Sequence, residues 1–95
     1  MLTTDVDDPA AFPYFTWDRP TTNAEIRAIL ATGSEPDRML WMARILREAR
    51  VPDVWHYLTL RDDVLPNWDR LRPQLGRRLA LWDYLISGWQ ADGLV

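Results

Sequence analysis

Apolar residues recur at helical spacing through most of the chain that follows residue 20. Thr22 and Glu25 have the spacing of a capping box, which predicts a helix that starts there and ends at Gly33. Ser34 has the side chain of a helix N-cap, so a second helix is expected from this residue to about Arg50. The apolar arc of this second helix consists of Met39, Met42, Ala43, Ile45, Leu46 and Ala49. Such a broad arc predicts that the helix lies against the core.

Prolines divide the next part of the chain. Val51-Pro52 is expected to end the second helix, and Asp53 is expected to cap one or two further turns. A longer helix is predicted over about 63–72, because Pro66 then lies in or near its first turn and Pro73 follows its end. Its apolar positions are Val64, Leu65, Trp68, Leu71 and Leu75.

A last helix is expected to start after Gly76 and to end near Ala91. Its apolar stripe consists of Leu81, Trp82, Leu85, Ile86 and Trp89. Gly93 is expected to form a left-handed C-terminal cap, with Leu94 folded back onto the last turn. The chain contains no alternation typical of strands. The pattern therefore predicts an all-α fold, a compact array of four to five short helices.

The first twenty residues have no helical period and contain Pro9, Pro13 and Pro20, so they are expected to form an extended arm. The arm is rich in aromatic residues, namely Phe12, Tyr14, Phe15 and Trp17. This much apolar surface is expected either to lie across the helical body or to dock on another chain. The predicted organisation is therefore an arm over 1–20 followed by a single helical domain over 21–95.

Composition narrows the functional classes. The chain has 95 residues, a formal net charge of -3 and no cysteine, so a disulfide framework and a thiolate metal site are excluded. The acidic start and the lack of a long apolar run argue against a secretory signal and a membrane span, and a cytoplasmic location is expected. A negative net charge is the wrong sign for a protein that grips phosphate backbones, which disfavours nucleic acid as a partner.

The residue types that carry catalysis are sparse. His56 is the only histidine and is expected to be structural, since no cysteine or well-placed serine accompanies it. Asp62, Asp63 and Asp69 could bind a divalent cation, but aspartates near a helix start more commonly cap backbone amides. No phosphate-binding loop, nucleophile elbow or paired-histidine motif is present. The sequence therefore predicts a protein that is not an enzyme and needs no cofactor or metal.

Arginine and tryptophan are the candidate binding residues. All eleven basic residues are arginines, and six residues are tryptophans. Trp55, Trp68, Trp82 and Trp89 lie on apolar faces and are expected in the core, whereas Trp41 could belong to the core or to an interface. A local basic cluster consists of Arg70, Arg72, Arg77 and Arg78. It is either a solvated surface paired with nearby aspartates or a patch for an acidic partner. The candidate partner-binding residues are Trp17, Trp41, Arg44, Arg47, Arg70, Arg72, Arg77 and Arg78.

Several short segments, spread over most of residues 14–95, resemble a known group of proteins. The segments are Tyr14–Asp18, Ala43–Arg50, Pro52–Thr59 and Leu75–Arg78, together with Trp82 and Gly88–Trp89. They resemble short bacterial antitoxin-like proteins encoded beside nucleotidyltransferase-type (Abi-like) toxins. The resemblance implies a neutralising or accessory partner of a nucleotidyltransferase-fold protein, and it carries no catalytic residues with it.

Together these observations predict a non-catalytic, intracellular protein-binding domain, and the resemblance implies that it is the antitoxin-like or accessory partner of a nucleotidyltransferase-type toxin. The alternative is a small nucleic-acid-binding module that uses the arginine cluster and stacking tryptophans. A self-associating domain that forms a homodimer is a third hypothesis.

Overall fold

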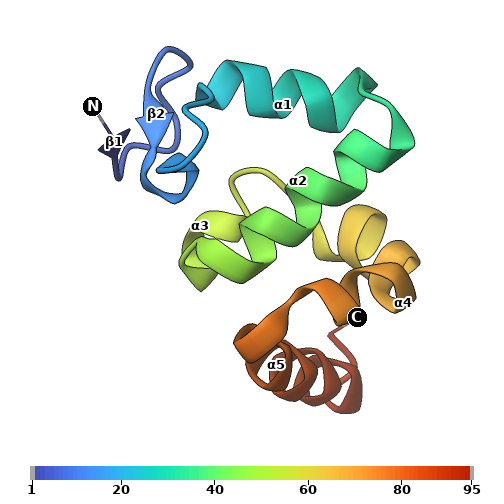
Figure 1. Cartoon of the computed structure of the whole chain (residues 1–95). Coiled ribbons are helices and arrows are strands. Elements are labelled where there is room, and N and C mark those ends of the chain that lie inside the picture. Colours follow the sequence, from blue (N-terminus) through green and yellow to red (C-terminus); the bar gives the residue numbers. More distant parts are fainter. Residues whose placement is uncertain (1, 95) are drawn as a thin grey trace.

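Helix α2 (Glu35–Glu48) is the central element of the fold. In the computed structural model, which describes residues 2–94, the other helices are arranged around it (Figure 1). These are α1 (Asn23–Thr32), α3 (Val51–Val54), α4 (Trp68–Leu71) and α5 (Leu79–Ala91). Every residue of the predicted apolar arc of α2 is buried, from Met39 to Ala49. The chain is thus a compact, mostly helical domain, as the pattern predicts.

The first two helices start at the predicted caps. In the capping box, the amide of Glu25 donates to Thr22 Oγ1 at 3.1 Å, and the amide of Thr22 donates to Glu25 Oε1 at 3.1 Å. The Ser34 hydroxyl accepts from the amide of Asp37 at 3.3 Å. Helix α1 ends at Gly33, where a Cβ would lie 2.5 Å from the carbonyl oxygen of Ile29. Glycine is therefore required there by close backbone approach.

The chain between α2 and α5 differs in two ways from the prediction. Asp53 lies inside the first turn of α3 and does not cap it; Arg50 is the N-cap residue. The single helix expected over 63–72 is a series of short turns, because Pro66 and Pro73 lack the amide proton that an α-helix interior needs. The series consists of a π-helical turn Leu60–Val64, a 3₁₀ turn Leu65–Asn67, α4, and 3₁₀ turns Arg72–Gln74 and Gly76–Arg78.

Despite these breaks, the predicted apolar positions of this stretch face the core. Val64, Leu71 and Leu75 are fully buried, and the two remaining positions, Leu65 and Trp68, are partly buried against them. Burial of the same side chains is therefore achieved without a continuous helix.

Helix α5 ends in a Schellman motif. The amide of Leu94 donates to the Trp89 carbonyl at 2.9 Å, and the amide of Gly93 donates to the Gln90 carbonyl at 3.1 Å. Gly93 has φ +73, the left-handed conformation expected from the sequence. Leu94 lies beside the last turn of α5, as predicted.

The N-terminal segment packs on the body of the same chain. Strand β1 (Leu2–Thr3) pairs in parallel with β2 (Phe12–Pro13), and a 3₁₀ turn, Tyr14–Thr16, follows. Phe15 is 1% exposed and makes an edge-to-face contact with Tyr57 at a ring-centroid distance of 5.4 Å. Two strands of two residues each are too short to show alternation, so the sequence pattern does not reveal them.

Of the four tryptophans expected in the core, Trp82 is buried, and Trp55, Trp68 and Trp89 are partly buried against the core. Trp82 is fully buried and donates from Nε1 to the Leu46 carbonyl at 2.8 Å. Trp55 contacts it edge to face at 5.8 Å and lies 6.1 Å from Trp89. None of the helices described here is long and apolar enough to span a membrane.

Candidate protein-binding surface

The structure separates the two tryptophans that the sequence nominates for binding. Trp41 is 5% exposed and belongs to the core, so the core alternative is the one observed. Trp17 is 66% exposed. Trp17 therefore presents an indole to solvent, and Trp41 does not.

Arg44 contacts residues that precede and follow Trp17 in the chain. Its Nε donates to the carbonyl oxygen of Phe15 at 2.9 Å, and its terminal nitrogen forms an ion pair with the carboxylate of Asp18. The Arg44 guanidinium also lies 5.8 Å from the ring centroid of Trp41. Only 14% of the Arg44 side chain is exposed, so this arginine positions Trp17 and offers little contact surface of its own.

The turn that carries Trp17 is held by further hydrogen bonds. The buried hydroxyl of Thr16 donates to the Pro13 carbonyl at 2.9 Å, and the amide of Arg19 donates to the Thr16 carbonyl at 3.2 Å. The hydrogen bond from Arg44 holds the pKa of Asp18 below its usual value, so this carboxylate is charged at neutral pH. The backbone of the turn that carries the Trp17 indole is thus held by hydrogen bonds on both sides of this residue.

A second anchor joins the same turn to α3. The Tyr14 hydroxyl donates to Asp53 Oδ2 at 2.7 Å and accepts from the Arg50 amide at 2.7 Å, and Arg50 Nε donates to the same carboxylate oxygen at 3.1 Å. Burial raises the pKa of Tyr14. Burial alone would raise the pKa of Asp53, but the hydrogen bonds from Tyr14 and Arg50 lower it overall.

Two of the candidate arginines, Arg47 and Arg78, form hydrogen bonds within the domain near the C-terminal end of α2. Arg78 Nη1 donates to the Ala49 carbonyl at 2.7 Å, and Arg47 Nη1 donates to the Gln74 carbonyl at 3.2 Å while Arg47 Nε pairs with Glu48 at 3.1 Å. Cations at this end of a helix complement its dipole. These contacts give both side chains a role within the domain.

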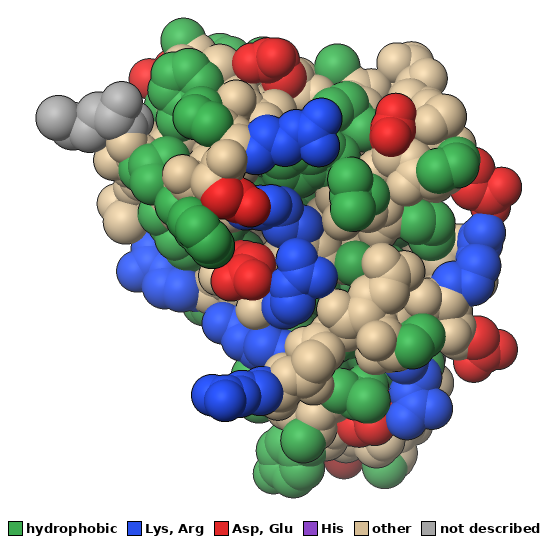
Figure 2. Space-filling model, in the orientation of Figure 1, with side chains coloured by type: hydrophobic (Ala, Val, Ile, Leu, Met, Phe, Trp, Pro, Cys, Tyr) green, Lys and Arg blue, Asp and Glu red, His purple; other side chains and the backbone are tan. Residues whose placement is uncertain are grey.

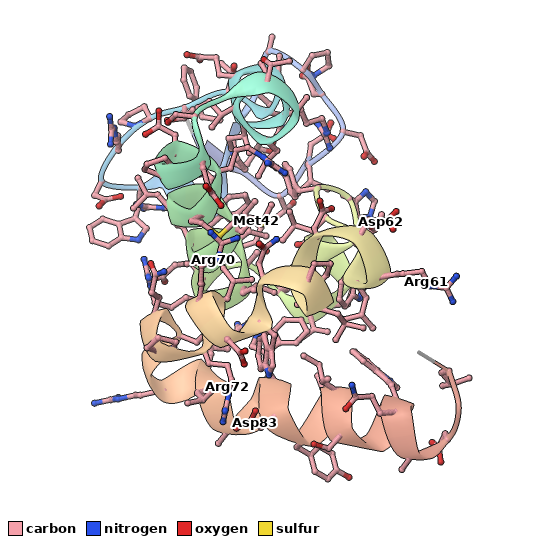
Figure 3. The ribbon with its side chains drawn as sticks, turned by 90° about the vertical axis from the view of Figure 1, so that its right-hand side faces the viewer. Met42, Arg61, Asp62, Arg70, Arg72 and Asp83 are labelled. Carbon is pink, nitrogen blue, oxygen red and sulfur yellow. The ribbon has the colours of Figure 1, made fainter. Side chains whose placement is uncertain are left out.

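The other arginines of the basic cluster mostly pair with carboxylates. Arg70 pairs with Glu35, and Arg72 Nη2 lies 2.9 Å from Asp83 Oδ2, at the start of α5 (Figure 3). Arg77 is exposed, and its side chain makes no hydrogen bond or ion pair with residues 2–94. The cluster is therefore a set of separately paired side chains with one free member.

Positive side chains nevertheless gather on one face. In Figure 2 the arginines crowd over the left and lower-left part of the molecule, with acidic groups between them. Arg44, Arg47, Arg50 and Arg78 meet around the C-terminal half of α2 through the contacts described above. Trp17 adjoins this basic face through Arg44.

The residues that suggested metal or acid-base chemistry have structural contacts. His56 Nδ1 lies 2.9 Å from Asp7 Oδ1, a partner that is distant in sequence. The carboxylate of Asp63 accepts from the Thr59 amide at 2.7 Å. Arg61 and Asp62 point outward from their turn (Figure 3). No group of three potential metal ligands occurs within the described part of the chain.

Sequence reasoning missed two apolar surfaces. The first is a groove of about 420 Å³ lined by Trp55, Leu58, Thr59, Leu60, Trp89 and Leu94. The second lies on the outer side of α5, where Tyr84 is 78% exposed and Leu81 is 40% exposed. The prediction that Leu81 faces the core is wrong, because Trp82 and Ile86 are the buried positions of this helix. The excess of apolar residues in α5 was the available signal.

Neither the family models, nor the curated proteins, nor the solved structures that were compared with this chain provide a match.

Proposed function

We propose that this chain is a non-catalytic protein-binding domain that engages its partner through Trp17 and the adjoining basic face. The observation that carries the proposal is an exposed indole on an ordered turn, since Arg44 binds the Phe15 carbonyl before Trp17 and the Asp18 carboxylate after it. Tryptophan and arginine are the residues most enriched among interface hot spots. A turn that is already ordered in the free chain also loses less conformational entropy when it binds.

The proposed partner is a nucleotidyltransferase-type toxin, and the chain would act as its antitoxin-like or accessory protein. This assignment rests on the resemblance of the segments quoted above. The basic face is compatible with an acidic surface on that partner, because Arg50, whose guanidinium lies 5.4 Å from the Tyr14 ring centroid, is exposed, as is Arg19, which follows the Tyr14–Thr16 turn. The absence of a metal-ligand group in residues 2–94 is compatible with a role in binding.

Co-purification with the product of the adjacent gene tests the proposal. The wild-type chain is expected to form a stable complex, and Trp17→Ala is expected to weaken binding by about 2 kcal/mol or more, a loss of at least ~30-fold in affinity. The matched control is Tyr84→Ala, which removes another exposed aromatic side chain, from α5. A chain that stays alone on co-expression, or equal losses for the two variants, would contradict the proposal.

Arg44→Gln separates positioning from direct contact. Arg44 is mostly covered, so its replacement is expected to act by loosening the turn that carries Trp17. Binding should then weaken while hydrogen exchange at the amides of residues 16–19 becomes faster. Unchanged exchange would refute a positioning role.

The alternative of nucleic-acid binding is weakened by the pairing of the arginines. Among the four residues of the local cluster, Arg70 and Arg72 pair with carboxylates and Arg78 binds carbonyl oxygens. A basic groove needs cations that are free to meet phosphates. Tryptophan quenching by single-stranded oligonucleotides at low salt would support this alternative, and its absence would remove it.

A further inference from the structure

Part of the outer face of α5 is uncharged along the length of the helix. At 100° per residue, five exposed residues fall within one arc of about 100° that contains no charged residue. They are Ala80, Leu81, Tyr84, Gly88 and Ala91, whereas the exposed Ser87 and Gln90 lie beside this arc, on either side of Asp83. The helix contains a single charged residue, Asp83, which pairs with Arg72. Helix α5 lies at the edge of the molecule in two perpendicular views, with the rest of the domain on one side only (Figures 1 and 3).

Neither packing nor backbone conformation within residues 2–94 explains why position 88 is a glycine. It lies in the interior of α5, where glycine costs about 1 kcal/mol relative to alanine. A Cβ at this position would meet no atom of residues 2–94 within 4 Å, and the backbone does not require a positive φ there. The small side chain therefore leaves a gap on the outer face, next to the exposed ring of Tyr84 one turn earlier.

Charges of opposite sign lie at the two ends of this face. Arg77 precedes α5 and Asp92 follows it, and both are exposed. Neither side chain has a hydrogen bond or ion pair to any other residue in the described range 2–94. The face therefore has a positive end, an uncharged middle and a negative end.

We propose that this face binds the same face of a second copy of the chain, with the two α5 helices antiparallel about a two-fold axis. In such a pair, residues equally far from the midpoint between Tyr84 and Leu85 face each other. Leu81 then lies opposite the gap at Gly88, and Arg77 lies opposite Asp92. Because a two-fold interface is self-complementary, each of these contacts occurs twice.

The two Tyr84 rings meet at the centre of this interface. The arrangement covers the most exposed aromatic side chain of the domain and both exposed leucine side chains of the facing helices. It leaves Trp17 and the basic face free, so homodimer formation and partner binding use separate surfaces. A single pair of helices buries less than the roughly 1,200 Å² of the smallest standard interfaces, so the dimer is expected to dissociate at micromolar concentrations.

Sedimentation of the full chain over a wide concentration range tests the proposal. A reversible monomer-dimer equilibrium is expected for the wild type and for the control Trp17→Ala. Tyr84→Asp is expected to shift the equilibrium toward monomer by at least tenfold. A chain that stays monomeric at all concentrations, or a dimer that survives Tyr84→Asp, would overturn it.

Further variants separate the interface from the fold. Gly88→Gln fills the gap with a better helix former, so the monomer should become more heat-stable while the dimer weakens at least tenfold. Arg77→Asp or Asp92→Arg alone should weaken the dimer about tenfold, because two like-charge contacts replace two attractive ones. The double exchange should restore it. Failure of the double exchange to restore dimerisation would refute the antiparallel register.

Discussion

Neighbouring arginines of the basic cluster should differ sharply in their contribution to stability. Arg78 donates to the Ala49 carbonyl at 2.7 Å, at the C-terminal end of α2, whereas Arg77 contacts no described side chain or carbonyl through its guanidinium. The perturbation is Arg78→Met, which keeps the aliphatic stem and removes the charge and the donors. Arg77→Met is the matched control.

The expected loss of stability for Arg78→Met follows from the interactions that the substitution removes. A hydrogen bond from a charged donor contributes about 1.5–3 kcal/mol, and a cation near a helix C-terminus contributes about 0.3–1 kcal/mol. The Ala49 carbonyl then loses the side-chain donor described here, while the Leu46 carbonyl keeps its bond from Trp82 Nε1. We therefore expect a loss of about 2 kcal/mol in the free energy of unfolding, and less than about 0.5 kcal/mol for Arg77→Met.

Urea unfolding followed by far-ultraviolet circular dichroism measures both values, at concentrations low enough to keep the chain monomeric. For a domain of this size, about 2 kcal/mol corresponds to a fall of roughly 8–16 °C in Tm. Equal effects of the two substitutions, or a negligible effect of Arg78→Met, would refute the assignment of Arg78 to the end of α2.

Three other changes test the packing. Trp82→Phe removes the hydrogen bond to the Leu46 carbonyl and part of a fully buried ring, so unfolding free energy should fall by about 2–3 kcal/mol in a denaturant titration; a loss below ~1 kcal/mol would contradict the burial of Trp82. Asn23→Ala removes the amide that donates to the Asp5 and Asp8 carbonyls, so limited proteolysis should cut the first thirteen residues faster while unfolding free energy falls by about 2 kcal/mol; unchanged proteolysis would argue against this attachment. The pKa of Asp53 is lowered on folding, so its contribution is complete above the unfolded-state pKa of about 3.9 and is lost as pH falls through the lower folded-state value. Asp53→Asn should therefore flatten the dependence of stability on pH below about 4, and an unaltered acid limb would contradict this role.

Local sequence was sufficient for the elements whose start and end signals are close together. The capping box at Thr22, the cap at Ser34 and the left-handed Gly93 each depend on residues within one helical turn. Every residue of the apolar arc predicted for α2 is buried, because a continuous helix keeps its periodicity, whereas the burial of Trp41 at the edge of this arc was left open. The broken stretch between α3 and α5 was not, since two prolines permit several short turns that bury the same residues.

The candidate site, in contrast, depends on contacts between residues that are far apart in the sequence. Trp17 was nominated from the sequence and is exposed, but the sequence could not show that Arg44 holds its backbone, because Arg44 and Asp18 are 26 positions apart. The partners of Arg70 and Arg78 are equally remote, in α2 and at its end. The uncharged face of α5 was overlooked because apolar residues surround this helix on nearly every side, and periodicity alone does not say which of them a neighbouring helix covers.

The sequence by itself determined the helical class, the N-caps of α1 and α2, the C-terminal cap of α5 and most of the side chains that form the core. These depend on short-range hydrogen bonds and on the removal of periodic apolar side chains from water. Only the tertiary structure decided that Trp41 is buried, that Trp17 is presented by Arg44, and that most of the arginine cluster is occupied within the domain. The physical reason is that an arginine takes whichever carboxylate or carbonyl the fold brings within reach, and that choice depends on how the helices are placed around α2.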